Sequence, residues 1–202
     1  MSDAKQSNAL LIIDAQKAFE RLEQEGAVPS DAVAKTRIAT LLKAYRAAEL
    51  PVIHVRHASL EPHSYFQSHL PGFEVMAAAR ERAGEVVVTK HVNSAFIGTE
   101  LEAILHDRGV RSLTIAGATL NHCVETTARM AANLGFRVRL VADATWAYPV
   151  QSLDGVTFPA SLVHAMSLAN LNGEFADIVT TNDVVGHLAA RPPVRPDDIP
   201  EV

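Results

Sequence analysis

The sequence predicts an α/β fold, a Rossmann-like three-layer α/β/α sandwich built on a parallel sheet. Six short apolar runs, rich in β-branched residues, alternate with longer segments that repeat apolar residues at helical spacing. Several of these runs lack alternating polar positions, which is typical of strands whose sheet is covered by helices on both faces. We expect right-handed crossovers between them, and a length of 202 residues predicts a single domain, residues 1–202.

The first half of the chain carries three predicted strands and one clear helix. Ser30 is a candidate N-cap of that helix, and Pro51 prevents its continuation past Glu49. The helix is therefore predicted over Ser30–Glu49. The three strands are predicted over Ala9–Ile13, Val52–Val55 and Val86–Thr89.

The second half alternates more regularly. A glycine follows each of its three predicted helices, as is common at helix C-termini. The helices are predicted over Thr99–Asp107, Asn121–Leu134 and Pro159–Leu171. The strands are predicted over Ser112–Ala116, Val138–Ala142 and Ala176–Val179.

Three segments have no regular pattern. Residues 57–73 hold histidines and aromatics, and residues 144–158 hold the only tryptophan. Both follow strands, so we expect them at the carboxyl edge of the sheet, where α/β proteins bind ligands. Residues 191–202 contain four prolines and are predicted to form an extended tail that could pack on a partner subunit.

Composition excludes several classes of protein. A formal charge of -5, with no long run of Lys or Arg, argues against a nucleic-acid partner. The apolar run that starts at Ala9 is too short to span a membrane, so no membrane partner is expected. Cys123 is the single cysteine, which rules out an intrachain disulfide and suits a reducing, cytoplasmic location.

Three reactive residue types follow separate predicted strands. Asp14 could be a general base or a turn-capping carboxylate, and Lys90 a paired cation or a lysine that extends to solvent. Cys123 falls in the first turn of a predicted helix, where backbone N–H groups and a nearby lysine favour a thiolate; otherwise it is a small core residue. Because parallel strand ends meet at one edge, the three together indicate a nucleophile, a base and a cation in one cleft.

Three segments around these residues resemble the isochorismatase-like cysteine hydrolase superfamily. They are LLIIDAQKAF at 10–19, VVTKHVNSAFIGTELEAIL at 87–105 and GATLNHCVETTARMAANLGFRVRLVADAT at 117–145. A fourth segment, VHAMSLANLNGEFADIVTTNDV at 163–184, is similar to the last helix and strand of that family. The resemblance covers residues 9–185 in the family's order.

The resemblance implies Asp14, Lys90 and Cys123 as a catalytic triad. It also implies a sheet of six parallel strands in the order 3-2-1-4-5-6. Members of the family commonly have a cis peptide bond at the position between Ala118 and Thr119, and the resemblance implies that it helps direct the backbone N–H groups of Thr119 and Cys123 at an oxyanion. No cofactor is implied, and family members usually form a homodimer or homotetramer.

The substrate is predicted to be a small molecule, an amide or ureide cleaved at a C–N bond through a thioester. Polar residues near the triad are candidate substrate contacts, and aromatic residues could form the pocket walls. The candidates are Gln16, Phe19, Asn93, Phe96, Asn121 and His122, with Trp146 and Tyr148 as weaker candidates for the wall.

Three alternatives stay open. A nicotinamidase-like amidase would use a metal, and His54, His57, His63 and His69 lie in the relevant region, but the Asp-x-His pair is missing and HLPGFEV resembles metal-independent members. We therefore expect no metal. Vinyl-ether hydrolysis of the isochorismatase type does not need a thiol, so Cys123 favours C–N cleavage. A non-catalytic oligomeric scaffold would not require the whole triad.

Overall fold

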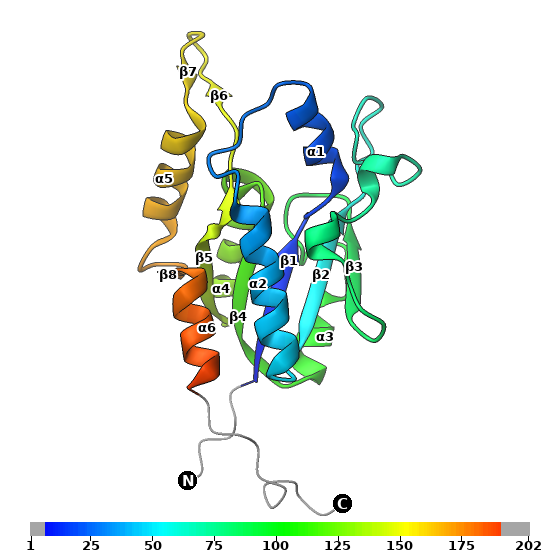
Figure 1. Cartoon of the computed structure of the whole chain (residues 1–202), viewed down its shortest axis with the longest axis vertical. Coiled ribbons are helices and arrows are strands. Elements are labelled where there is room, and N and C mark those ends of the chain that lie inside the picture. The colour runs from blue at the N-terminus through cyan, green and yellow to red at the C-terminus, as the bar shows by residue number, and fades with distance from the viewer. Residues whose placement is uncertain (1–6, 191–202) are drawn as a thin grey trace, which may run out of the picture.

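The computed structural model describes residues 7–190, which form a six-stranded parallel sheet covered by helices on both faces (Figure 1). The strand order is β3-β2-β1-β4-β5-β8, which is the predicted 3-2-1-4-5-6 order when the six strands are numbered along the chain. The predicted tail, 191–202, lies outside the described residues. The strands span Ser7–Ile13 (β1), Val52–His57 (β2), Val86–Lys90 (β3), Val110–Ala118 (β4), Arg137–Trp146 (β5) and Asp177–Val179 (β8).

The helices form two layers, and two apolar cores lie between them and the sheet. In Figure 1, α2 and α6 lie in front of the sheet and α3 and α4 behind it. The front core also includes α1, and the rear core also includes α5. The helices span Lys17–Gln24 (α1), Ala34–Ala47 (α2), Leu101–Asp107 (α3), Glu125–Asn133 (α4), Ala160–Leu171 (α5) and Thr181–Ala189 (α6).

The central strand β1 shows why its run of apolar residues has no polar alternation. Leu11 and Ile13 are buried in the rear core, whereas Leu10 and Ile12 are buried in the front core. Successive side chains of a strand point to opposite faces, so a strand with helices on both sides needs apolar residues at every position. Within residues 7–190, no helix has the length and apolar character needed to cross a bilayer.

Several elements were not predicted. No helix was predicted for α1 or α6, and the hairpin of β6 (Val150–Gln151) and β7 (Thr157–Phe158) lies in segment 144–158, which was expected to be irregular. Ser30 was wrongly predicted to cap α2, which begins four residues later. Its hydroxyl instead accepts a hydrogen bond from the N–H of Ala147 (3.0 Å), and so joins the segment before α2 to the end of β5.

The carboxyl edge of the sheet has an unusual backbone at its centre, between β1 and β4. The strand order reverses direction there, which opens a crevice above the strand ends. Asp14 has a φ of 49°, and this turns the chain away immediately after β1. Gly117 has a φ of 123°, and a Cβ at that position would lie 2.0 Å from the Ile13 carbonyl oxygen. The close approach of β1 and β4 therefore requires glycine at 117.

Candidate active site

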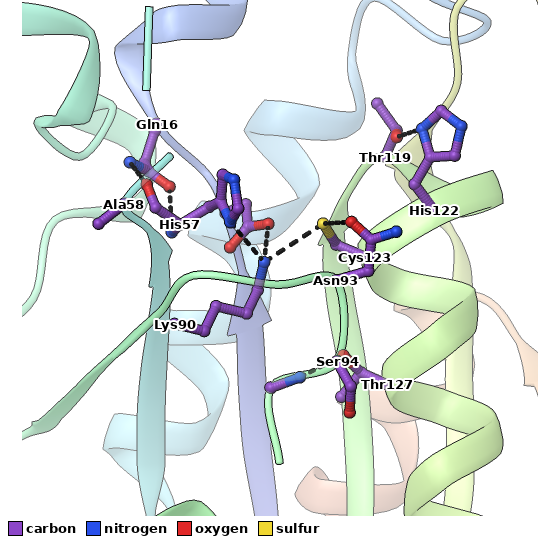
Figure 2. A network of polar contacts seen from close by, with 12 residues as sticks. Gln16, His57, Ala58, Lys90, Asn93, Ser94, Thr119, His122, Cys123 and Thr127 are labelled. Carbon is purple, nitrogen blue, oxygen red and sulfur yellow. Dashed lines mark hydrogen bonds and ion pairs between the residues drawn. The ribbon is translucent and has the colours of Figure 1, made fainter. Parts of the chain in front are cut away.

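Three residues predicted from separate segments meet at this edge of the sheet. Asp14 follows β1, Lys90 is the last residue of β3, and Cys123 lies in the short helix η3 (Leu120–Val124) that follows β4. The Nζ atom of Lys90 lies 2.7 Å from Oδ2 of Asp14 and 3.2 Å from Sγ of Cys123. Lys90 thus bridges the carboxylate and the thiol (Figure 2).

Lys90 and Asp14 form a buried ion pair. The Lys90 side chain is fully buried and that of Asp14 is 2% exposed. Burial raises the pKa of Asp14 above its ordinary value, although the charge of Lys90 and its hydrogen bond oppose the rise. The second carboxylate oxygen, Oδ1, is buried and has no hydrogen-bond partner among the described residues. Asp14 is therefore a carboxylate with one held oxygen and one oxygen available to take a proton.

The surroundings of Cys123 favour the neutral thiol, although its position in the first turn of a helix favours a thiolate. Burial and the negative charge of Asp14 raise the pKa of Cys123 to about 12, and Lys90 opposes this rise only in part. Its Sγ atom also lies 3.7 Å from Oδ1 of Asn93. Proton removal from Cys123 thus requires a base, and Asp14 is the adjacent one.

The segment before Cys123 has the predicted cis peptide bond, between Ala118 and Thr119. The helix predicted from Asn121 instead begins with one π-helical turn, η3, and continues as α4 from Glu125. The Thr119 carbonyl accepts hydrogen bonds from the N–H groups of His122 (3.1 Å) and Val124 (3.2 Å). These bonds tie the turn to the first residues of the helix around Cys123.

A cavity of about 340 Å³ opens above the three residues. Asp14 and Cys123 lie in its lining, and so do five residues that were predicted for the site. These five are Phe19, Asn93, Thr119, Asn121 and His122. Both irregular segments contribute to the lining as well, Ser64 and Phe66 from the first and Tyr148 and Pro149 from the second.

Aromatic side chains build one wall of the cavity. The ring of Phe19 contacts Phe66 edge-on at 4.9 Å between centroids and stacks on Tyr148 at 5.9 Å. Trp146 does not line the cavity; it is fully buried, and its Nε1 atom donates to the Tyr148 hydroxyl at 3.2 Å. Trp146 therefore supports the wall from behind, whereas it was expected from the sequence to be part of the wall.

Two predicted substrate contacts are placed elsewhere. Gln16 is fully buried and does not line the cavity, because both ends of its side-chain amide bond backbone groups. Phe96 packs in the rear core, where its ring stacks on Phe136 at 6.0 Å between centroids. Both residues lie close to the triad in sequence, and sequence proximity could not separate residues that support the site from residues that line it.

From the sequence, His57 was considered only as a metal ligand, and Ser64 and Phe66 were given no role in the site. His57 is the last residue of β2 and lines the cavity, with its Nδ1 atom 3.4 Å from Nζ of Lys90. The sequence did contain a signal for His57. Like Lys90 in β3, His57 lies at the carboxyl end of its strand. Ser64 and Phe66 lie in a segment without periodicity, and no signal in the sequence points to them.

The histidines of this region do not form a metal site. Within residues 7–190, no three His, Cys, Asp or Glu side chains gather as metal ligands would. His54 is buried in β2, and its Nε2 atom lies 2.9 Å from Oε2 of Glu85. His63 and His69 are exposed. The side chains present therefore do not fit the metal site considered from the sequence.

Comparison with known proteins identifies the class to which this fold and site belong. The Isochorismatase domain family matches residues 8–183. A crystal structure of an isochorismatase-family protein from Chromobacterium violaceum has a TM-score of 0.87 and 39% identity, and the match covers 94% of this chain and 97% of that one. The chain belongs to the isochorismatase family of hydrolases.

Among curated relatives, the uncharacterized isochorismatase family protein YrdC of Bacillus subtilis is 37% identical over 90% of this chain and 96% of its own length. A streptothricin hydrolase of Streptomyces noursei is 36% identical over 91% of this chain and 70% of its own. The maleamate amidohydrolase of Pseudomonas putida is 31% identical over 55% of this chain and 47% of its own. Two of these relatives are named as hydrolases, and one of the two is an amidohydrolase.

Proposed function

We propose that the protein is a cysteine-dependent hydrolase that cleaves a C–N bond of a small amide or ureide through a thioester intermediate. The observation that carries this proposal is the position of Lys90, whose ammonium contacts both Asp14 and Cys123 at the base of a cavity. The relatives named as amidohydrolases support the C–N bond as the target, and the free thiol supports covalent catalysis.

The first half of the reaction forms the thioester. Asp14 accepts the thiol proton at its unpaired Oδ1, and the sulfur of Cys123 attacks the carbonyl carbon of the substrate. The carbonyl oxygen becomes an oxyanion, which the backbone N–H groups of Thr119 and Cys123 would stabilise. The C–N bond then breaks as Asp14 returns the proton to the leaving nitrogen. Lys90 offsets the negative charge that accumulates on Asp14 and sulfur.

The second half restores the thiol. A water molecule attacks the thioester carbon while Asp14 takes one of its protons. The C–S bond breaks, the proton returns to the sulfur, and the carboxylic or carbamic acid product leaves. Asn93, Asn121 and His122 provide polar groups in the cavity that would orient the substrate, and the aromatic wall would pack against its apolar part.

Assembly of the protein into a homodimer or homotetramer is a separate prediction.

The direct test is Cys123→Ala, with ammonia release measured over a panel of small amides and ureides. We expect turnover to fall by at least about a thousandfold, because the variant has no nucleophile, while the thermal midpoint stays close to that of the unmodified protein. Intact mass spectrometry should detect a covalent adduct with the mass of the acyl group in the protein that retains Cys123, and no adduct in Cys123→Ala.

Retained ammonia release in Cys123→Ala would exclude covalent cysteine catalysis and favour metal-dependent chemistry. Hydrolysis of a vinyl ether, with no ammonia released from any amide or ureide, would favour the isochorismatase type. Release of ammonia only after zinc or iron is added would favour the nicotinamidase type. A folded protein with no turnover and no adduct for any panel member would favour the scaffold.

A further inference from the structure

His57 completes the set of acceptors around the Lys90 ammonium. An ammonium group has three N–H donors and no acceptor. The Nζ atom of Lys90 lies 2.7 Å from Oδ2 of Asp14, 3.2 Å from Sγ of Cys123 and 3.4 Å from Nδ1 of His57. Each donor therefore has one acceptor, and the ammonium of the fully buried Lys90 side chain is held from three directions (Figure 2).

This contact favours one tautomer of the neutral His57 ring. A nitrogen that accepts from an ammonium carries no proton, so the ring proton lies on Nε2. Burial, followed by the charges of Lys90 and His91, lowers the pKa of His57 to about 4, which keeps the ring neutral at pH 7. His57 lines the cavity, and Figure 2 shows its second ring nitrogen directed away from Lys90. The ring therefore offers an N–H donor on that side.

Gln16 holds the backbone of His57 from both sides. Its Oε1 atom accepts from the His57 N–H (2.7 Å), and its Nε2 atom donates to the His57 carbonyl (3.1 Å) and to the Phe73 carbonyl (3.0 Å). Because the chain turns away from the sheet at Asp14, β1 has no backbone left to pair with the end of β2. The side chain of Gln16 takes over that pairing.

The ring of Phe66 fixes the orientation of the imidazole. It packs against His57 at 5.9 Å between centroids, with an angle of 66° between the ring planes. With the backbone held by Gln16, the ring supported by Phe66 and Nδ1 facing Lys90, His57 has little freedom to rotate.

We propose that His57 is a positioning residue that holds Lys90 between Asp14 and Cys123, and that its Nε2–H donates to an uncharged acceptor oxygen of the substrate. The proposal rests on the proposed function and deepens it, since it names a chemical requirement for the substrate. Such an acceptor is a second carbonyl or ureide oxygen beside the scissile bond. Gln16 acts through His57 and does not touch the substrate.

The test compares His57→Phe, which keeps a ring against Phe66 but has no ring nitrogen, with His57→Gln, whose side-chain oxygen can still accept from Lys90. His187→Phe is the control, because His187 is exposed in the last turn of α6, far from the cavity. Cys123 is alkylated with iodoacetamide without substrate across pH 6–10, and kcat and KM are measured for the best panel amide and for an analogue without the second oxygen.

For His57→Phe we expect alkylation about tenfold slower, with its pH profile moved to higher pH, because a loosened Lys90 no longer stabilises the thiolate. His57→Gln should recover most of the rate, and His187→Phe should match the unmodified protein. KM for the amide with the second oxygen should rise about tenfold in His57→Phe, and KM for the analogue should not change.

An alkylation profile for His57→Phe that superimposes on that of the unmodified protein would overturn the positioning role. Equal changes in KM for both substrates would overturn the donor role. If no panel member is turned over, the proposed function fails, and alkylation still decides the positioning role because it needs no substrate. If His57→Phe does not fold, Gln16→Glu replaces it, because a glutamate cannot donate to the His57 carbonyl. Alkylation of Cys123 should be slower in that variant too. An unchanged alkylation profile would contradict the positioning role of His57.

Discussion

The chemistry of Cys123 depends on two neighbours with opposite charges. Burial raises the pKa of the thiol most, the charge of Asp14 raises it further, and Lys90 lowers it. The result is a thiol that gives up its proton less readily than an exposed cysteine does. A carboxylate whose own pKa is raised by burial is a stronger base than an exposed one, so the same burial that protects the thiol prepares Asp14 to deprotonate it.

Replacing Asp14 tests this balance directly. In Asp14→Asn the negative charge beside the thiol is gone, so the pKa of Cys123 should fall and alkylation at pH 8 should be at least about tenfold faster. Turnover should nevertheless fall by about a hundredfold or more, since no base remains. Intact mass spectrometry against pH measures the first effect, and ammonia release measures the second.

Asp177→Asn is the matched control, because Asp177 is exposed on β8 and carries the same change of charge. It should leave both measurements unchanged. Slower alkylation in Asp14→Asn would show that Asp14 lowers the pKa of the thiol, which would contradict this prediction.

At the scale of elements, the site depends on the contact between β1 and β4. These two strands contribute Asp14 and the turn that leads to Cys123, and their register pairs Ile13 with Gly117. A Cβ at 117 would lie 2.0 Å from the oxygen and 2.7 Å from the nitrogen of Ile13, which are backbone atoms of the central strand. A side chain at this position would push apart the two strand ends that lead to Asp14 and Cys123.

We therefore expect Gly117→Ala to lower the free energy of unfolding by at least about 3 kcal/mol, through the clash and the positive φ together. Gly186→Ala is the matched variant: it lies within α6 with nothing within 4 Å of the new Cβ, and it should stabilise the protein by about 0.5–1 kcal/mol. Urea denaturation midpoints measure both. Equal effects of the two substitutions would contradict the close approach of β1 and β4.

At the scale of the whole molecule, an ion cluster joins the front helix layer to the edge of the sheet. Arg46 of α2 binds Glu85 through two hydrogen bonds of 2.6 and 2.8 Å, and Glu85 also contacts His54 of β2 at 2.9 Å. Burial alone would raise the pKa of Glu85, but hydrogen bonds from Arg46, the Arg82 N–H and His54 outweigh it and lower the pKa to about 2.

This cluster predicts how the protein responds to acid. The pKa of Glu85 is lower in the folded state than its ordinary value of 4.5, so its stabilisation is complete above pH 4.5 and is lost as the pH falls toward 2. The loss corresponds to about 3 kcal/mol at most. Urea denaturation between pH 7 and pH 2 should show this loss in the unmodified protein.

Glu85→Gln should be less stable than the unmodified protein at pH 7, and the difference should disappear near pH 2. The control is Glu61→Gln, an exposed glutamate, which should follow the unmodified protein throughout. A difference between Glu85→Gln and the unmodified protein that stays constant with pH would show that the charge of Glu85 does not carry the stabilisation.

The periodic parts of the chain were predictable because local sequence encodes them. All six strands of the sheet and four of the helices were predicted, since their apolar residues repeat at the spacing that two cores impose. α1 was missed because it begins without a capping side chain and buries only Ala18 and Phe19. α6 was missed because its start signal, the capping box of Thr180 and Asp183, was not recognised. The hairpin of β6 and β7 has strands of two residues each, which give no readable period.

The sequence by itself determined the α/β class and pointed to the three reactive residues, because each of Asp14, Lys90 and Cys123 lies at the end of a recognisable strand or just after one. Only the tertiary structure decided which neighbours line the cavity. Gln16 and Phe96 turned out to be buried supports, whereas His57 and Phe66 line the cavity. The pKa of Cys123 also depends on the tertiary structure, since burial and the distances to Asp14 and Lys90 set it. The physical reason is that strand periodicity is local, whereas burial and charge at a site come from residues far apart in the chain.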